Sequence, residues 1–120
     1  MKVGIFGSWD WESYPEIMRQ MTLFIQESHE IGHSEILFVH TGSKGAENMI
    51  TEYIGKTEKF LRQKGYKIKE ELVRDKSSFS DVTMIESEPG IALIFGDNQR
   101  NRSCMKILDT FGIPYRYFPK

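Results

Sequence analysis

Short apolar runs alternate along this chain with longer stretches in which apolar residues recur at helical spacing. The runs at Lys2 to Gly7, Ile36 to His40 and Gly90 to Phe95 are rich in branched and aromatic residues, as strands buried on both faces are. Tyr66 to Val73 carries more charge, which indicates an edge strand. Pro114 to Phe118 is predicted to be the final strand.

Four helices are predicted between these strands, because apolar residues there recur every three or four positions. They cover about Tyr14 to Glu30, Ala46 to Gly65, a short segment that ends at Ser87, and a segment that Gly112 ends. Ser78 or Ser80 is expected to cap the short helix after a polar loop. The inward faces are expected to include Phe60 in the second helix and Cys104, Ile107, Leu108 and Phe111 in the last one.

Strict alternation of strands and helices favours a parallel sheet covered by helices on both faces. A chain of 120 residues suits one domain, so residues 1–120 are expected to form a single α/β, Rossmann-like unit. The short, apolar first, second and fourth strands predict a five-stranded parallel sheet in the order 3-2-1-4-5.

The stretch from Ile36 to Glu47 combines a buried strand, a tight glycine loop and the first turn of a helix. Gly42 and Gly45 let the backbone turn sharply and let another group come close to it. Unpaired N–H groups and a partial positive charge at a helix start suit phosphate. The loop has neither the Walker spacing nor GxGxxG, and many such turns in α/β proteins bind nothing.

Polar groups follow three of the predicted strands, in the loops Gly7 to Trp11, Thr41 to Glu47 and Gly96 to Arg102. In doubly wound sheets ligands bind at the carboxyl ends of the strands, where the strand order reverses. If the first strand lies between the second and the fourth, the three loops converge on one crevice, which is the predicted ligand site.

The side chains of these loops suit a nucleotide-like molecule. Serine and threonine hydroxyls and basic side chains are predicted to hold phosphate, and the two tryptophans to stack on a base. Asp10 and Glu47 are predicted to accept ribose hydroxyls, or to act as the catalytic groups at a glycosidic carbon. The predicted ligand-binding set is Gly7, Ser8, Trp9, Trp11, Thr41, Gly42, Ser43, Lys44, Gly45, Gly96, Asp97, Asn98, Arg100 and Arg102.

Each of these residues also has a purely structural interpretation. At least one tryptophan is expected to cover a helix end, Glu47 suits a first helical turn through the helix dipole, and Asp97 and Asn98 are ordinary helix caps. Asp10 suits a turn cap, and the two arginines suit a solvated surface. His40 and Cys104 are interpreted as a satisfied strand-end histidine and a core residue.

Composition narrows the classes of partner. The net charge of −1 argues against a general attraction to nucleic acid. One cysteine excludes an internal disulfide, and no Cys/His zinc pattern occurs, so neither a metal nor another cofactor is expected. The first strand begins almost at the amino terminus, without a signal peptide, and no stretch approaches the length of a membrane span. We therefore expect a cytoplasmic protein without a membrane partner.

Three motifs point to a family. The sequence G-S-W-D-W at residues 7–11 resembles the G-S-R-D-W/F motif after the first strand of small SLOG-superfamily proteins. The sequence V-H-T-G-S-K-G-A-E at residues 39–47 resembles their V-H-G-G-A-R-G-A-D motif, and G-I-P-Y at residues 112–115 resembles their G-I-P-V ending. The resemblance spans nearly the whole chain.

The superfamily has a Rossmann-like fold and includes the lonely-guy phosphoribohydrolases, the DNA-processing protein of natural transformation, and sensor domains for nucleotide-derived signals. The resemblance implies a nucleotide or nucleotide-sugar ligand with its phosphate on the second glycine loop. It also implies a homodimer, and it favours Glu47 over Asp10 as the catalytic carboxylate.

The chain departs from the hydrolase branch of that superfamily in two places. F-G-D-N-Q-R-N at residues 95–101 stands where the hydrolases have P-G-G-x-G-T, and residues 77–81 stand where they have A-G-x-x-R-N. These differences favour a sensor or sequestering protein over an enzyme. An N-glycosidic hydrolase and a scaffold for protein–protein interaction are the alternative functions.

Overall fold

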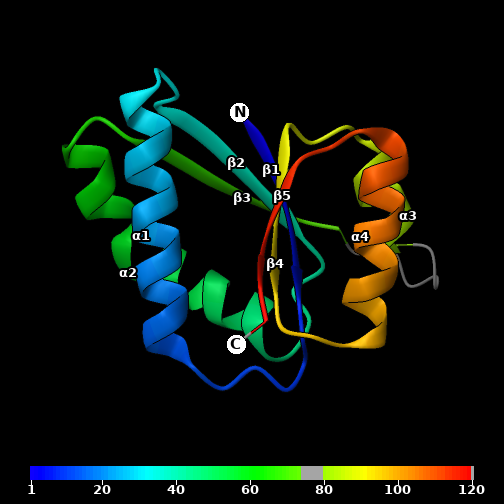
Figure 1. Ribbon diagram of the computed structural model, residues 1–120. Coiled ribbons are helices and arrows are strands. Elements are labelled where there is room, and N and C mark those ends of the chain that lie inside the picture. Colours follow the sequence, from blue (N-terminus) through cyan, green and yellow to red (C-terminus); the bar gives the residue numbers. More distant parts are fainter. Residues whose placement is uncertain (74–79, 120) are drawn as a thin grey trace.

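A computed structural model describes residues 1–73 and 80–119, in which five strands and four helices alternate (Figure 1). The polar loop and the Ser78 cap that the sequence predicts lie outside the described residues. The elements are β1 (Lys2–Gly7), α1 (Tyr14–Glu30), β2 (Glu35–His40), α2 (Ala46–Gln63), β3 (Lys67–Leu72), α3 (Ser80–Glu86), β4 (Ile91–Phe95), α4 (Gln99–Phe111) and β5 (Tyr115–Phe118).

The strands form one sheet in the order β3-β2-β1-β4-β5, with every neighbouring pair parallel. The register places Val3 of β1 opposite Phe38 of β2 on one side and Ile91 of β4 on the other. The predicted fold class, strand order and strand directions are therefore confirmed. The order reverses between β1 and β4, since the chain runs from β1 toward β3 and then crosses back to β4.

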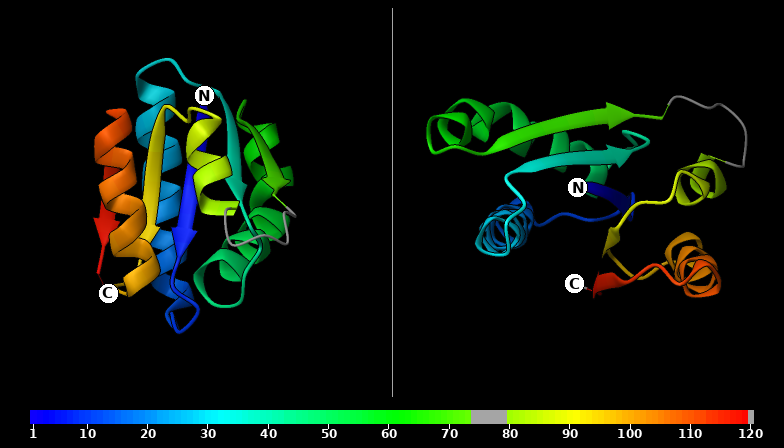
Figure 2. Two further views of the ribbon diagram at one scale, coloured as in Figure 1. Left: turned by 90° about the vertical axis from the view of Figure 1, so that its right-hand side faces the viewer. Right: turned by 90° about the horizontal axis from the view of Figure 1, so that it is seen from above.

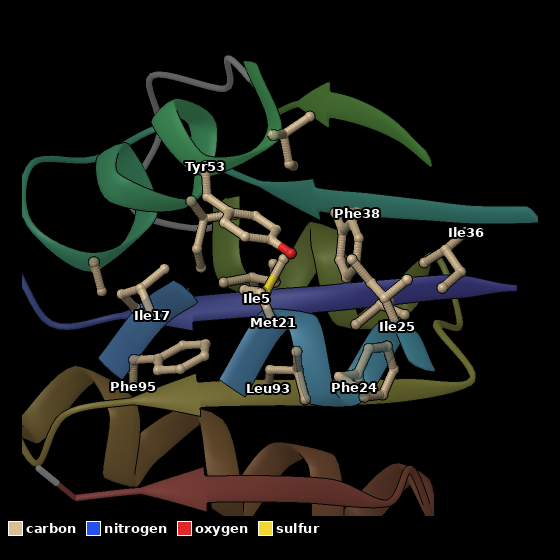
Figure 3. Packing of buried hydrophobic residues seen from close by; sticks show 14 of the residues in the cluster. Ile5, Ile17, Met21, Phe24, Ile25, Ile36, Phe38, Tyr53, Leu93 and Phe95 are labelled. Carbon is tan, nitrogen blue, oxygen red and sulfur yellow. The ribbon is translucent and has the colours of Figure 1, made fainter. Parts of the chain in front are cut away.

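Helices cover both faces of the sheet, α1 and α2 on one and α3 and α4 on the other (Figures 1 and 2). Alternate strand residues point to opposite faces, so Ile5 belongs to the core beneath α1 and α2, whereas Phe6 belongs to the core beneath α3 and α4. Figure 3 shows the first core, in which Met21 and Ile25 of α1 lie against Phe38 and Leu93 of the sheet.

Two expectations about the helix faces are wrong. Phe60 is 59% exposed and Phe111 is 50% exposed, although both were expected to point inward. The buried residues of α2 end at Ile54 and those of α4 at Leu108, so both phenylalanines lie beyond the last buried residue of their helix.

The loops after β1, β2 and β4 lie at the lower side of Figure 1. Two of them end in helix caps that fix where the helices begin. Ser13 accepts the N–H of Glu16 at the start of α1, and Asn98 accepts the N–H of Asn101 at the start of α4. Within residues 1–73 and 80–119, no helix is long and apolar enough to cross a membrane.

Candidate functional site at the carboxyl ends of the strands

The loops after β1, β2 and β4 meet around Ser8, which is almost completely buried. The Ser8 N–H donates to the carbonyl oxygen of Phe95 at 2.7 Å, which ties the first loop to β4. The Ala46 N–H donates to the carbonyl oxygen of Ser8 at 3.2 Å, which ties it to the start of α2. The convergence that the strand order predicts is therefore present, and the backbone of the first loop lies at its centre.

Two glycines make this packing possible. A Cβ atom on Gly45 would lie 2.4 Å from the Ser8 carbonyl oxygen, and one on Gly96 would lie 2.3 Å from the Ser8 Cβ. Both residues have left-handed backbones, with φ of +91° and +102°. The close approach that Gly45 permits is made by the neighbouring protein loop, so its glycine has a structural reason independent of any ligand.

Glu47 is fully buried and binds the converging loops together. Its Oε1 accepts the Thr41 N–H and the Thr41 hydroxyl, both at 2.8 Å. Its Oε2 accepts the Gly7 N–H at 3.1 Å, the Ser43 hydroxyl at 2.9 Å and Nη1 of Arg100 at 2.9 Å. The carboxylate thus has five donors, which come from the end of β1, the glycine loop after β2 and α4.

These contacts fix the charge of Glu47. Burial alone would raise its pKa, but the neighbouring His40 ring, the charge of Arg100 and the bonds from Thr41 and Gly7 lower the pKa to about 2. A carboxylate that is ionised and already holds five donors organises the loops. The geometry favours a positioning role for Glu47, and its predicted catalytic role remains a prediction.

Arg100 serves the same network. Its Nε and Nη2 each donate to the Asp81 carboxylate at 2.8 Å, and its Nη1 donates to the Gly7 carbonyl oxygen at 3.1 Å as well as to Glu47. Burial lowers the pKa of Arg100, but pairing with Asp81 and Glu47 outweighs burial and raises the pKa above its ordinary value. The guanidinium group that the sequence assigns to phosphate is engaged mainly by protein acceptors.

His40 extends the network to the edge strand β3. Its Nε2 lies 2.7 Å from Oε2 of Glu70, and its Nδ1 accepts the Gly42 N–H at 2.9 Å while lying 3.7 Å from Oε1 of Glu47. Burial disfavours the charged ring, but the carboxylates of Glu47 and Glu70 outweigh it and raise the His40 pKa. The imidazole is thus partnered at both nitrogens, as its structural interpretation requires.

An open hollow of about 740 Å³ is lined in part by Ser8, and Glu47, Arg100 and His40 are absent from its lining. It is formed by the loops after β1 and β4 and by the residue after β5, so it lies at the point where the strand order reverses. Its described lining consists of Ser8, Asp10, Trp11, Glu12, Ser13, Gly96, Asp97 and Pro119.

The predicted site residues therefore divide into two groups. Five of them line the hollow, and the residues of the second glycine loop, with Glu47 and Arg100, do not. Gly7 and Thr41 contribute N–H groups to Glu47, and the exposed Gly42 and Lys44 belong to the outer part of the glycine loop. Gly42 has a left-handed φ of +73°, and a Cβ there would make only ordinary contacts with Leu72.

The two tryptophans differ in their surroundings. Trp11 is 7% exposed, packs edge-on against Phe95 with ring centroids 5.7 Å apart, and donates its indole N–H to the Ser13 carbonyl oxygen. Trp9 is 67% exposed and stands between two residues that line the hollow, Ser8 and Asp10. Trp9 is the indole that remains free to stack on a ligand, whereas Trp11 forms part of the wall.

The loop after β4 contains a helix cap and an exposed ion pair. Asn98 caps α4, as its structural interpretation predicts, and Asp97 lines the hollow while pairing with Arg102 at 2.7 Å. Both members of that pair are about half exposed, so the pair contributes little to stability. Asp10 is exposed at the opposite wall and accepts a hydrogen bond from the Ser8 hydroxyl.

Several residues at this end were not predicted from the sequence. Glu12 and Ser13 of the first loop also line the hollow. They could have been predicted from the sequence by including every loop residue up to the cap of the following helix. The side chain of Asn101 donates to the carbonyl oxygens of Phe95 and Gly96 at 3.1 and 2.9 Å and so fixes the fourth loop. Tertiary contacts also bring in Asp81, Glu70 and Pro119, and the sequence around these three residues does not indicate a place in the site.

Neither a metal centre nor a reactive thiol emerges from this arrangement. Among the described residues, no group of three His, Cys, Asp or Glu side chains is placed to hold a metal ion. Burial and the nearby Asp81 carboxylate raise the pKa of Cys104 to about 12, so its thiol is protonated and unreactive at neutral pH.

Comparison of the chain with models of protein families, with curated proteins and with solved structures finds no match.

Proposed function

We propose that this protein binds a nucleotide-derived small molecule in the hollow between the loops after β1 and β4, as a sensor or sequestering domain. The observation that carries the proposal is the position of the hollow, because doubly wound sheets bind ligands where their strand order reverses. A volume of about 740 Å³ is of the size that small-molecule sites have. Membership of the SLOG superfamily is part of the same proposal and rests on the three sequence motifs.

The lining supports a ligand of this kind. The Ser13 hydroxyl and the carboxylates of Asp10 and Asp97 offer hydrogen bonds to sugar hydroxyls. Trp9, which stands between the lining residues Ser8 and Asp10 in the sequence, offers an exposed ring for a base, and a stacked base typically contributes about 1–3 kcal/mol to binding. Trp9→Ala is therefore expected to weaken binding, while the wall residue Trp11 is not a suitable probe because its loss would disturb the core.

The experiment is a thermal-shift panel of nucleosides, nucleoside phosphates and nucleotide sugars, followed by backbone amide mapping with the compound that stabilises most. We expect shifts concentrated in residues 8–13 and at Gly96 and Asp97. Shifts at the amino ends of the strands, or no stabilisation by any member of the panel, would overturn the proposal.

An N-glycosidic hydrolase is the alternative, and the geometry supports Asp10, the candidate that the position of the first loop favours, over Glu47, the candidate that the resemblance favours. Asp10 borders the hollow and is exposed, whereas Glu47 is fully buried and absent from the lining. The same panel, incubated and separated by chromatography, distinguishes the two functions. Release of a free base that Asp10→Asn abolishes with unchanged affinity would establish the enzyme, since such a carboxylate acts in the transition state.

A further inference from the structure

We propose that the hollow takes the neutral ribonucleoside part of a ligand and disfavours a phosphate, so that uncharged ribonucleosides bind more tightly than their 5′-monophosphates. This inference rests on the proposed function and specifies the charge of the ligand at the same site. It departs from the expectation that phosphate is the group the chain recognises.

The first step is the charge of the lining. Asp10, Glu12 and Asp97 contribute three carboxylates, and no described residue of the lining is a lysine or an arginine. Arg102 offsets part of this charge through its pair with Asp97 at 2.7 Å. A phosphate placed in the hollow would face like charges, and an open, salt-accessible site screens that repulsion only in part.

The second step concerns the cations that were expected to hold phosphate. Arg100 directs Nε and Nη2 to Asp81 and Nη1 to Gly7 and Glu47. Lys44 belongs to the glycine loop after β2 and is absent from the lining. Arg100 is thus engaged by protein acceptors, and neither residue belongs to the described lining of the hollow.

The third step distinguishes a hydroxylated ligand from a cationic one. The lining combines acceptors, the carboxylates, with a group that also donates, the hydroxyl of Ser13. A sugar hydroxyl both donates and accepts, and carboxylates bind ribose hydroxyls in dinucleotide-binding folds. An ammonium group would use only the acceptors. The exposed ring of Trp9 then suits the uncharged base.

The test compares three versions of each common nucleoside: the free 5′-hydroxyl form, the 5′-monophosphate and the 5′-amino derivative, by calorimetry at low and moderate salt. We expect the free nucleoside to bind about tenfold or more tightly than the monophosphate, the size of effect that one charged contact produces. We also expect added salt to narrow that gap by screening the repulsion.

The matched variants are Asp97→Asn and Asp109→Asn. Asp97 lines the hollow, whereas Asp109 is exposed near the other end of α4 and loses the same charge. Asp97→Asn is expected to weaken the nucleoside and strengthen the monophosphate, so that the preference falls several-fold, while Asp109→Asn leaves it unchanged.

Tighter binding of the monophosphate, or binding of the amino derivative tenfold tighter than both, would overturn this inference while leaving the proposed function in place. No binding of any nucleoside or nucleotide would overturn both.

Discussion

Arg100 and Glu47 are 53 positions apart in the chain, and Nη1 of the arginine donates to Oε2 of the glutamate across 2.9 Å. The same carboxylate accepts the Gly7 N–H, and the same guanidinium reaches the Gly7 carbonyl oxygen. The pair therefore holds the end of β1 between α2 and α4. Since the first loop also forms one wall of the hollow, the shape of the candidate site depends on an ion pair whose two residues are absent from the lining of the hollow.

Glu47→Gln separates the positioning role of this residue from a catalytic one. The amide keeps the size of the side chain but loses the charge that Arg100 and five hydrogen bonds depend on, so we expect a loss of unfolding free energy of about 3 kcal/mol or more. Chemical denaturation measures it. The matched control is Glu58→Gln on the same helix, whose exposed pair with Arg62 predicts a change within about 0.5 kcal/mol. Unchanged stability with lost turnover would instead restore the catalytic role.

The Glu47 pKa also predicts how stability depends on acid. Its pKa is about 2 in the folded protein and 4.5 for the unperturbed group, so the unfolded chain binds the proton first. The stabilisation is fully present above pH 4.5 and is lost as the pH falls toward 2, by an amount on the order of 3 kcal/mol. Denaturation curves between pH 6 and pH 3 test this, and in Glu47→Gln this part of the acid dependence should be absent.

His40 predicts a response with the opposite sign. Its pKa is raised above 6.5, so its stabilisation is present below pH 6.5 and is lost as the pH rises through the folded value. A protonated Nδ1 cannot accept the Gly42 N–H that it accepts in the structure, so the Gly42 amide should move with the same midpoint as the imidazole. Nuclear magnetic resonance of both groups measures this. The Gly112 amide, in another left-handed turn remote from His40, serves as the control. A Gly42 amide shift that does not change as His40 titrates would contradict this coupling between the two groups.

Local sequence patterns were sufficient to predict the fold, because the residues of each strand and helix indicate its type without reference to the rest of the chain. Ile36 to His40 is apolar enough to require cover on both faces, and a charged strand such as Lys67–Leu72 is tolerated only at an edge. Side-chain periodicity did not predict the exposure of Phe60 and Phe111, which lie beyond the last buried residue of their helices.

The candidate site was harder to predict, since its contacts join residues distant in sequence. The motif around Glu47 indicates a charged group beside a glycine loop, but nothing near it indicates that Arg100 supplies the counter-charge or that Asp81 orients Arg100. Trp9 is exposed and Trp11 is buried, because Trp11 packs against Phe95 of β4. Residue type thus predicted which end of the sheet carries polar chemistry, and tertiary contacts decide which of those groups face a ligand.

The two glycines of the second loop give the sharpest contrast between a structural and a ligand-directed role. Gly45→Ala would place a Cβ 2.4 Å from the backbone oxygen of Ser8 at a φ of +91°, so the loops must separate, and we expect a loss of several kcal/mol or failure to fold. Gly42→Ala meets only the side chain of Leu72 at 3.5 Å, so its cost is the left-handed backbone alone, about 1–2 kcal/mol. Gly42→Asn should cost less, because asparagine tolerates that conformation. Thermal and chemical denaturation of the three variants test the order. A stable Gly45→Ala protein would mean that the space beside Gly45 is open, as a phosphate loop requires, and would return the glycine loop to the list of ligand-binding elements.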